Sequence, residues 1–357
     1  MKEAQKEFLK KYLDNPSPSG FEARLGSQQI WLDELSKYTY KTEMDTYGSA
    51  YAFLGNENSE YTILVEAHAD EIGWYVHHIS NDGYIHVSTI GGSDKLITPS
   101  MRVNIHTKHG TINGIFGHPA IHVQKDFKID TNQIFIDVGA KDKKHVENMG
   151  IHVGCPITFQ DGVMELGKNW ICGRSLDNKI GGFILSEIAR KLHNENFMPD
   201  FKVVFVNAVQ EEVGLLGARM AANNIKPNVA LVIDVTHDTT SPCYNKLRDG
   251  DIVAGNGPTL SISPAVHNNL LDHVFDVLKN SEIPHQLQAG SYTGTDTDAF
   301  AYSGKGIASC LFSIPLKYMH TTVETCHKRD VKNITKAIVN TIKNIESGHD
   351  FGYKHTK

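Results

Sequence analysis

The sequence has few cysteines and no long apolar run, and each absence excludes a class of protein. Its five cysteines are widely spaced and include no Cys-x-x-Cys pair, which is typical of reduced, buried thiols rather than of a disulfide framework. The apolar runs have the length of strands and are far shorter than a membrane span. The charged start of the chain, Met1 to Glu7, has no apolar stretch, so we expect no secretory signal and a cytoplasmic protein.

Charge of one sign is not concentrated anywhere. The 35 lysines and arginines and the 41 aspartates and glutamates are mixed along the chain and leave a net charge of −6. A basic block is typical of nucleic-acid binding and a polybasic amphipathic segment of membrane binding, and the sequence has neither. We therefore expect neither nucleic acid nor a membrane as a partner.

The length of the chain and a change in its secondary-structure pattern indicate two domains. With 357 residues, it exceeds the usual size of one domain. From about residue 166 onward, helix and strand patterns alternate, which predicts βαβ units and an α/β fold with a mostly parallel sheet flanked by helices. The preceding segment consists of short β-prone stretches separated by glycines. We predict an α/β domain made of residues 1–71 and 166–357, interrupted by a small inserted β-domain, residues 72–165.

Two adjacent carboxylates, Glu211 and Glu212, follow an apolar strand and precede a turn that contains glycine. Ligands of open α/β sheets bind at the carboxyl ends of strands. Two neighbouring acids are unfavourable there unless a cation or a proton separates their roles. Acids in the first turn of a helix also stabilise its dipole, so the pair favours a site without establishing one.

Five further polar residues stand at predicted strand ends or at a loop-to-helix junction. His68 and Asp70 lie two apart at the end of a strand, so their side chains point the same way, and Asp70 could hold the ring of His68. Taken alone, Asp177 also suits a helix N-cap and Asp234 a turn at the end of a strand. His320 is one of 19 histidines, most of which we expect to have no special role.

Taken together, these residues indicate a metal site, because all of them fall at predicted strand ends of one sheet. Their order along the chain is His68, Asp177, Glu211 and Glu212, Asp234, His320. Nitrogen and carboxylate ligands without thiolates suit Zn²⁺, Co²⁺ or Mn²⁺. One shared carboxylate, with a histidine and another carboxylate on each side, would hold two ions. His237 and Asp238 lie just behind Asp234 and could take its place.

Five segments of the sequence resemble, in order, the M42 family of metallo-aminopeptidases, which includes the glutamyl aminopeptidases and the tetrahedral TET peptidases. They span nearly the whole chain and include His-Ala-Asp-Glu-Ile-Gly, Gly-Arg-Ser-Leu-Asp-Asn-Lys-Ile-Gly and Gln-Glu-Glu-Val-Gly-Leu-Leu-Gly-Ala. The segments are residues 68–73, 173–181, 210–218, 233–236 and 313–320.

The resemblance implies a set of ligands for two divalent metal ions per subunit. Asp177 would bridge the two ions. His68 and Asp234 would complete the ligands of one ion, and Glu212 and His320 those of the other. Zn²⁺ is the first expectation for the metal, with Co²⁺ and Mn²⁺ as alternatives.

The resemblance also implies catalytic roles and an assembly. Glu211 would be the general base and Asp70 would support His68, while the peptide bond between Asp177 and Asn178 would be cis. The β insertion would be a PDZ-like dimerisation domain. The protein would be a homo-oligomer, from a dimer up to a tetrahedral dodecamer.

These roles predict a metal-dependent aminopeptidase that hydrolyses N-terminal residues from peptides. One alternative is a related co-catalytic metallohydrolase, either a carboxypeptidase or an N-acyl-amino-acid deacylase. Another is a glycoside hydrolase that uses Glu211 and a second acid without metal. A third is a metal-stabilised assembly protein with no activity on peptides.

Overall fold

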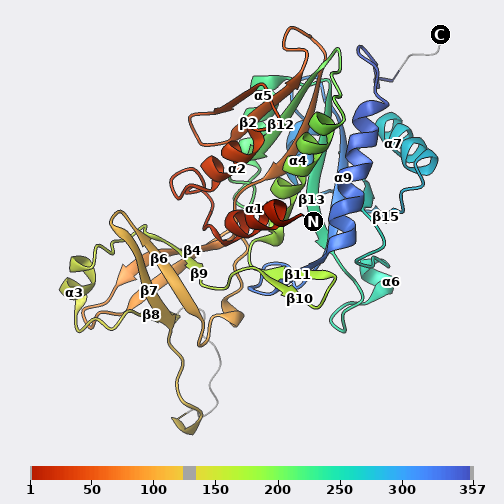
Figure 1. The fold of residues 1–357 in the computed structure, drawn as a ribbon. Coiled ribbons are helices and arrows are strands. Elements are labelled where there is room, and N and C mark those ends of the chain that lie inside the picture. Colours follow the sequence, from red (N-terminus) through yellow and green to blue (C-terminus); the bar gives the residue numbers. More distant parts are fainter. Residues whose placement is uncertain (1, 124–133, 354–357) are drawn as a thin grey trace.

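The most apolar strands of the chain form the centre of one large sheet in this computed structural model, which describes residues 2–123 and 134–353 (Figure 1). The central strands pair in parallel, in the order β12, β3, β13, β16. Nearly all of their residues are buried, as expected of parallel strands covered by helices. Their bounds are Lys202–Ala208 (β12), Thr62–His68 (β3), Val229–His237 (β13) and Ala308–Lys317 (β16).

Shorter strands extend this sheet on both sides, and most of them pair antiparallel. They are β1 (Lys41–Met44), β2 (Ala50–Gly55), β10 (Met164–Leu166), β11 (Trp170–Gly173), β14 (Thr259–Ile262), β15 (Gln286–Ala289) and β17 (Glu324–His327). Short turns join β1 to β2 and β10 to β11, and such turns allow only antiparallel pairing, whereas a parallel pair needs a long crossover. The expectation of a mostly parallel sheet is therefore right for the four central strands and wrong for the margins, and the sheet as a whole is mixed.

Helices flank the sheet in two separate groups. In one group α4 packs on β3 and contacts α1, α2 and α9, with α7 beyond α9 (Figure 1). In the other, α5 and α8 contact each other, α5 packs on β12, and α8 packs on β13 and β16. The bounds are α1 (Glu3–Asp14), α2 (Ser27–Leu35), α4 (Leu176–Asn194), α5 (Leu216–Ile225), α7 (Asn268–Asn280), α8 (Asp296–Ala301) and α9 (Lys328–Lys343). Among the described residues, no helix is both long enough and apolar enough to cross a bilayer.

Six strands from the middle of the chain close into a small barrel beside the sheet (Figure 1). All of their pairs are antiparallel. The barrel has its own core, separate from that of the sheet, in which Trp74 packs edge-on against Phe116 and Phe159. The strands are β4 (Gly73–Ile79), β5 (Ile85–Ile90), β6 (Arg102–Thr107), β7 (Gly110–Phe116), β8 (Phe135–Asp137) and β9 (Pro156–Phe159).

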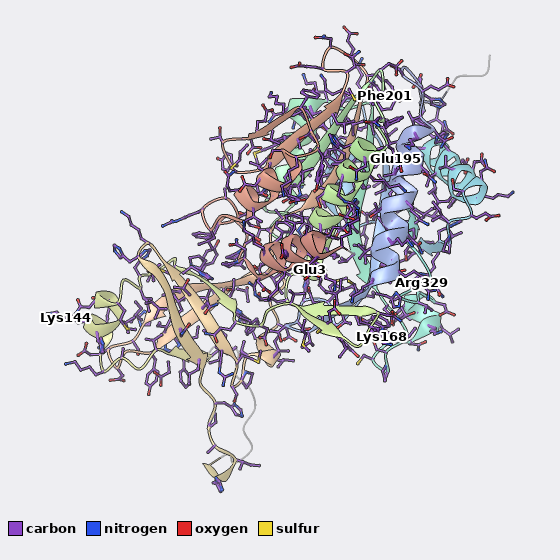
Figure 2. All side chains as sticks on the ribbon, in the orientation of Figure 1. Glu3, Lys144, Lys168, Glu195, Phe201 and Arg329 are labelled. Carbon is purple, nitrogen blue, oxygen red and sulfur yellow. The ribbon has the colours of Figure 1, made fainter. Side chains whose placement is uncertain are left out.

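The barrel enters and leaves the rest of the chain at neighbouring strands. Its first strand, β4, pairs with its last, β9, and Trp74 lies opposite Ile157. A short helix, α3 (Lys143–Asn148), packs at its far end, where Figure 2 shows Lys144 well apart from Glu195 at the end of α4. The two ends of the insertion are therefore close together where they meet the sheet.

We expect the barrel core to depend on Trp74, whose side chain is fully buried. Trp74→Ala should lower the free energy of unfolding by about 3–5 kcal/mol, since it removes a large buried ring and leaves a cavity. The matched control is Tyr84→Ala in the same barrel, because Tyr84 is 41% exposed and its loss should have a much smaller effect. Chemical denaturation followed by circular dichroism measures both, and equal stability of the two variants would contradict the expectation.

Candidate metal centre

The structure brings all seven residues predicted for the site together, at the edge where the central strands end. This follows from parallel pairing, because the carboxyl ends of parallel strands meet at one edge of the sheet. His68 ends β3, Asp177 lies at the start of α4, Asp234 lies in β13, and His320 follows β16. The remaining three are Asp70, just after β3, and Glu211 and Glu212, in the loop between β12 and α5.

Sharp turns of the backbone aim these side chains at one another. Ser175, Gln210 and His320 have positive φ values of 60°, 61° and 61°, a left-handed conformation that is unfavourable for residues other than glycine and is concentrated at functional sites. The peptide bond between Asp177 and Asn178 is cis, as the resemblance implied.

Asp177 lies at the centre of the cluster, and its two carboxylate oxygens face two different histidines. Its Oδ1 lies 3.2 Å from His68 Nε2, and its Oδ2 lies 3.4 Å from His320 Nε2. Asp234 Oδ1 is 3.8 Å from His68 Nε2 on one side, and Glu212 Oε2 is 3.6 Å from His320 Nε2 on the other. Each oxygen of Asp177 thus faces one histidine, and that histidine also lies near one further carboxylate.

These residues fit divalent metal ions. The ligand atoms of His68, Asp177 and Glu212 lie within 4.8 Å of one another, and so do those of His68, Glu211 and Asp234. Two ligands at about 2.0–2.2 Å from a tetrahedral Zn²⁺ lie roughly 3.3–3.6 Å apart, close to the separations observed here. None of the described residues that line the adjacent pocket is a lysine or an arginine, so no protein cation of that kind neutralises these carboxylates.

The pKa values show how strongly the acids are crowded. Burial raises the pKa of Glu211 to about 10. The charge of His68 lowers this pKa, and the charge of Asp234 raises it further. Burial raises the pKa of Asp234 to about 7, and burial and the charge of Asp177 raise the pKa of Glu212 well above its ordinary value. Asp177 differs: burial raises its pKa, but hydrogen bonds from His320 and His68 hold the pKa below its ordinary value. With protein groups alone the cluster retains protons, which a divalent cation would displace.

Asp70 joins three of the predicted residues. Its Oδ1 lies 3.3 Å from His68 Nδ1 and accepts the backbone N–H of Glu211 at 2.9 Å. Its Oδ2 accepts the backbone N–H of Glu212 at 3.2 Å and the hydroxyl of Ser19 at 2.6 Å. The carboxylate therefore fixes both the ring of one histidine and the loop that carries the glutamate pair.

Glu324 does the same for the other half of the site, although the sequence did not identify it as a site residue. The residue lies in β17 and is 2% exposed. Its Oε2 accepts the backbone N–H of Asp177 at 3.0 Å, and its Oε1 accepts that of His320 at 2.8 Å. The available signal was an acid four residues after His320 in an otherwise uncharged stretch, which is unusual for a buried strand.

Two more buried acids lie behind the site and were also missed. Glu66 precedes His68 by two residues on β3, and Asp296 begins α8. None of the four carboxyl oxygens has a hydrogen-bond partner among the described residues. Burial raises the pKa of both groups well above the ordinary range, and the charge of Glu66 raises that of Asp296 further, so the pair retains protons.

The two residues that could have replaced Asp234 have other partners. His237 Nδ1 lies 3.0 Å from the hydroxyl of Tyr244. Asp238 accepts the backbone N–H groups of Thr240 and Ala254. Of these candidates, only Asp234 lies among the ligand atoms of His68.

A pocket of about 530 Å³ opens in front of the cluster. One wall is the cluster itself, including Glu211 and His320. The rest of the lining comes from the end of β13, from β14 and β15, and from the loop that follows β15. A small molecule or the end of a peptide can therefore reach the candidate ligands from one side.

Comparison with known proteins identifies a family for this chain. Residues 48–337 match the family model described as M42 glutamyl aminopeptidase. A lysyl aminopeptidase of Pyrococcus furiosus is 31% identical over 348 residues, which cover 94% of this chain and 97% of that protein. The solved structure of the aminopeptidase APDkam598 from Desulfurococcus kamchatkensis has a TM-score of 0.88 at 30% identity, over 97% of each chain. The TET1 peptidase of Pyrococcus horikoshii, titled as able to assemble into a tetrahedron or a large octahedral shell, has a TM-score of 0.83 at 28% identity, over 94% of this chain and 98% of that one.

We expect Glu324→Gln to weaken divalent-ion binding by about 10–100-fold, the usual effect of losing a group that orients ligands. The amide keeps the shape of the side chain, but its NH₂ group cannot accept the second backbone N–H. Isothermal titration of the metal-depleted protein with Zn²⁺ measures the affinity, and circular dichroism verifies the fold. Glu195→Gln, which changes a partly exposed acid at the end of α4, is the matched control. Unchanged affinity in Glu324→Gln would show that its two hydrogen bonds do not position the ligands.

Proposed function

The chain belongs to the M42 glutamyl aminopeptidase family, and on that premise we propose that it is a metal-dependent aminopeptidase that removes N-terminal residues from peptides. One observation supports the proposal above all others. A single carboxylate, Asp177, stands between two sets of histidine and carboxylate, and Glu211 lies beside them in the same pocket.

The donors divide into two ligand sets that share Asp177. His68 and Asp234 would complete one set, and Glu212 and His320 the other. Imidazole and carboxylate donors suit Zn²⁺, and Co²⁺ or Mn²⁺ accept the same types of ligand. When bound, two such ions would polarise the scissile carbonyl and make water a stronger acid.

Glu211 would act as the general base. Its carboxylate would take a proton from the attacking water and then deliver it to the leaving amine. The side chain is well placed for this, because Asp70 holds its backbone N–H and its Oε2 lies 3.9 Å from His68 Nε2. Burial raises its pKa, and positive charge at the neighbouring ligands would bring that pKa back down, so the group can bind and release a proton. The adjacent Glu212 would serve as a ligand, which leaves Glu211 free.

The pocket would also suit action at the end of a peptide. A substrate would enter from the open side and contact the part of the lining that comes from β14, β15 and the following loop. The free α-amino group of the substrate would contact an ion or one of the buried carboxylates. A peptide with a blocked amine would lose this contact.

The barrel would serve assembly rather than chemistry. We propose that residues 72–165 form an inserted domain, PDZ-like as in the family, between two parts of the catalytic domain, residues 1–71 and 166–357. The domain would pair two subunits. The TET1 peptidase of Pyrococcus horikoshii, which by its title can assemble into a tetrahedron or a large octahedral shell, supports a homo-oligomer here, from a dimer to a tetrahedral dodecamer.

Glu211→Gln should lower kcat on a peptide substrate by about 10²–10⁴-fold, the usual contribution of a positioned general base. Zinc content should stay at the wild-type level, because the change keeps the shape of the side chain and leaves the proposed ligands intact. Steady-state kinetics and elemental analysis measure the two quantities. Glu57→Gln, at an exposed position, is the control for a change of charge alone, and near-normal turnover in Glu211→Gln would reject the role of base.

Treatment with EDTA should abolish release of N-terminal residues, and Zn²⁺, Co²⁺ or Mn²⁺ should restore it. A glycoside hydrolase that uses two carboxylates without metal would be unaffected by the chelator. Peptides with free and with acetylated amino termini, compared by chromatography of the products, separate the remaining alternatives. Preference for the acetylated peptide would point to a deacylase, and release of the C-terminal residue to a carboxypeptidase.

A further inference from the structure

Beside the candidate ligands, one wall of the pocket carries uncharged polar side chains from β13, β14 and β15. Thr236 lies in β13, two residues after Asp234, and its hydroxyl donates a hydrogen bond to Gln288 Oε1 at 2.8 Å. Gln288 lies in β15 directly opposite Ser261 of β14. Ser263 follows β14 and also lines the pocket. The wall thus offers an amide held in place among small hydroxyl-bearing residues.

This wall contains no positive charge that could bind an anion. Its described lining has no lysine or arginine. Within that lining, the only histidine outside the proposed ligands is His237, whose Nδ1 contacts the Tyr244 hydroxyl. Burial, followed by the charge of His320, lowers the pKa of His237, so the ring is neutral at pH 7–8. The carboxylates of Asp177, Glu211, Glu212 and Asp234, which line the pocket, would balance the charge of two divalent ions, so the lining has no surplus positive charge.

An acidic side chain would therefore bind here at a disadvantage. Moving a carboxylate out of water is unfavourable unless a cation pairs with it. An uncharged side chain with hydrogen-bonding groups avoids that penalty and can pair with the amide of Gln288.

We propose that this wall, formed by Thr236, Ser261, Ser263 and Gln288, is the subsite for the side chain of the N-terminal residue, and that it selects asparagine and glutamine over aspartate and glutamate. The inference rests on the proposed aminopeptidase function and specifies its substrate class. It also predicts that this chain does not prefer an N-terminal glutamate, although the family model that matches it is described as glutamyl aminopeptidase.

The test uses pairs of substrates that differ in charge but not in shape. We expect kcat/KM of the metal-loaded protein to be at least about tenfold higher for Asn-Ala-Ala than for Asp-Ala-Ala, and likewise for Gln-Ala-Ala over Glu-Ala-Ala, within the range of discrimination that one pocket contact provides. Gln288→Lys adds a cation to the wall and should shift both ratios toward the acidic substrate by about tenfold. Gln288→Met, of similar length and without charge, should produce no such shift.

Binding provides a second measurement that does not depend on turnover. Isothermal titration of Glu211→Gln with the same four peptides should show tighter binding of the uncharged member of each pair. Equal kcat/KM for the acidic and the uncharged substrates, or equal affinities, would overturn the subsite. Failure to hydrolyse any of a broad set of peptides would instead overturn the proposed function, while the titration would still decide whether the wall discriminates against negative charge.

Discussion

The centre depends on two buried carboxylates that bind backbone N–H groups. Asp70 accepts the N–H groups of Glu211 and Glu212, and Glu324 accepts those of Asp177 and His320. Four residues from three separate segments are thus held at the main chain by two acids. Because these hydrogen bonds hold the main chain, they fix the position from which each of the four side chains extends.

This arrangement is needed because the negative charges of the neighbouring acids repel one another. The acids that raise one another's pKa values lie at the edge of a sheet whose central strands are almost wholly buried, and their own burial limits how far water screens their charges. A loose loop would let them separate. The fold prevents this by ending parallel strands at one edge and by turning the backbone through left-handed residues at Ser175, Gln210 and His320, so the large apolar core of the sheet supports an arrangement that is unfavourable by itself.

Much of this could be predicted from the sequence, and the limits have physical causes. Residues such as His68 and Asp234 could be placed because they follow apolar runs, and the ends of parallel strands must meet. The antiparallel margins were missed because strands of three or four residues, such as β10 and β17, are too short to show a period. Glu324 was missed for a different reason: it acts through the backbone of its partners, which leaves no pattern of side-chain types. The identity of the pocket wall depends on which loop returns to which strand, and this is set by the fold as a whole.

The pairing of β4 with β9 has a consequence for how such a chain can diversify. In the sequence, the barrel lies between His68 and the other candidate ligands. Its first and last strands nevertheless pair with each other, so the chain leaves the sheet and returns to it at nearly the same place. The barrel can therefore become longer, shorter or different in its surface without changing the distance between β3 and α4. A change confined to the barrel can therefore be inherited without any change to the cluster at the edge of the sheet.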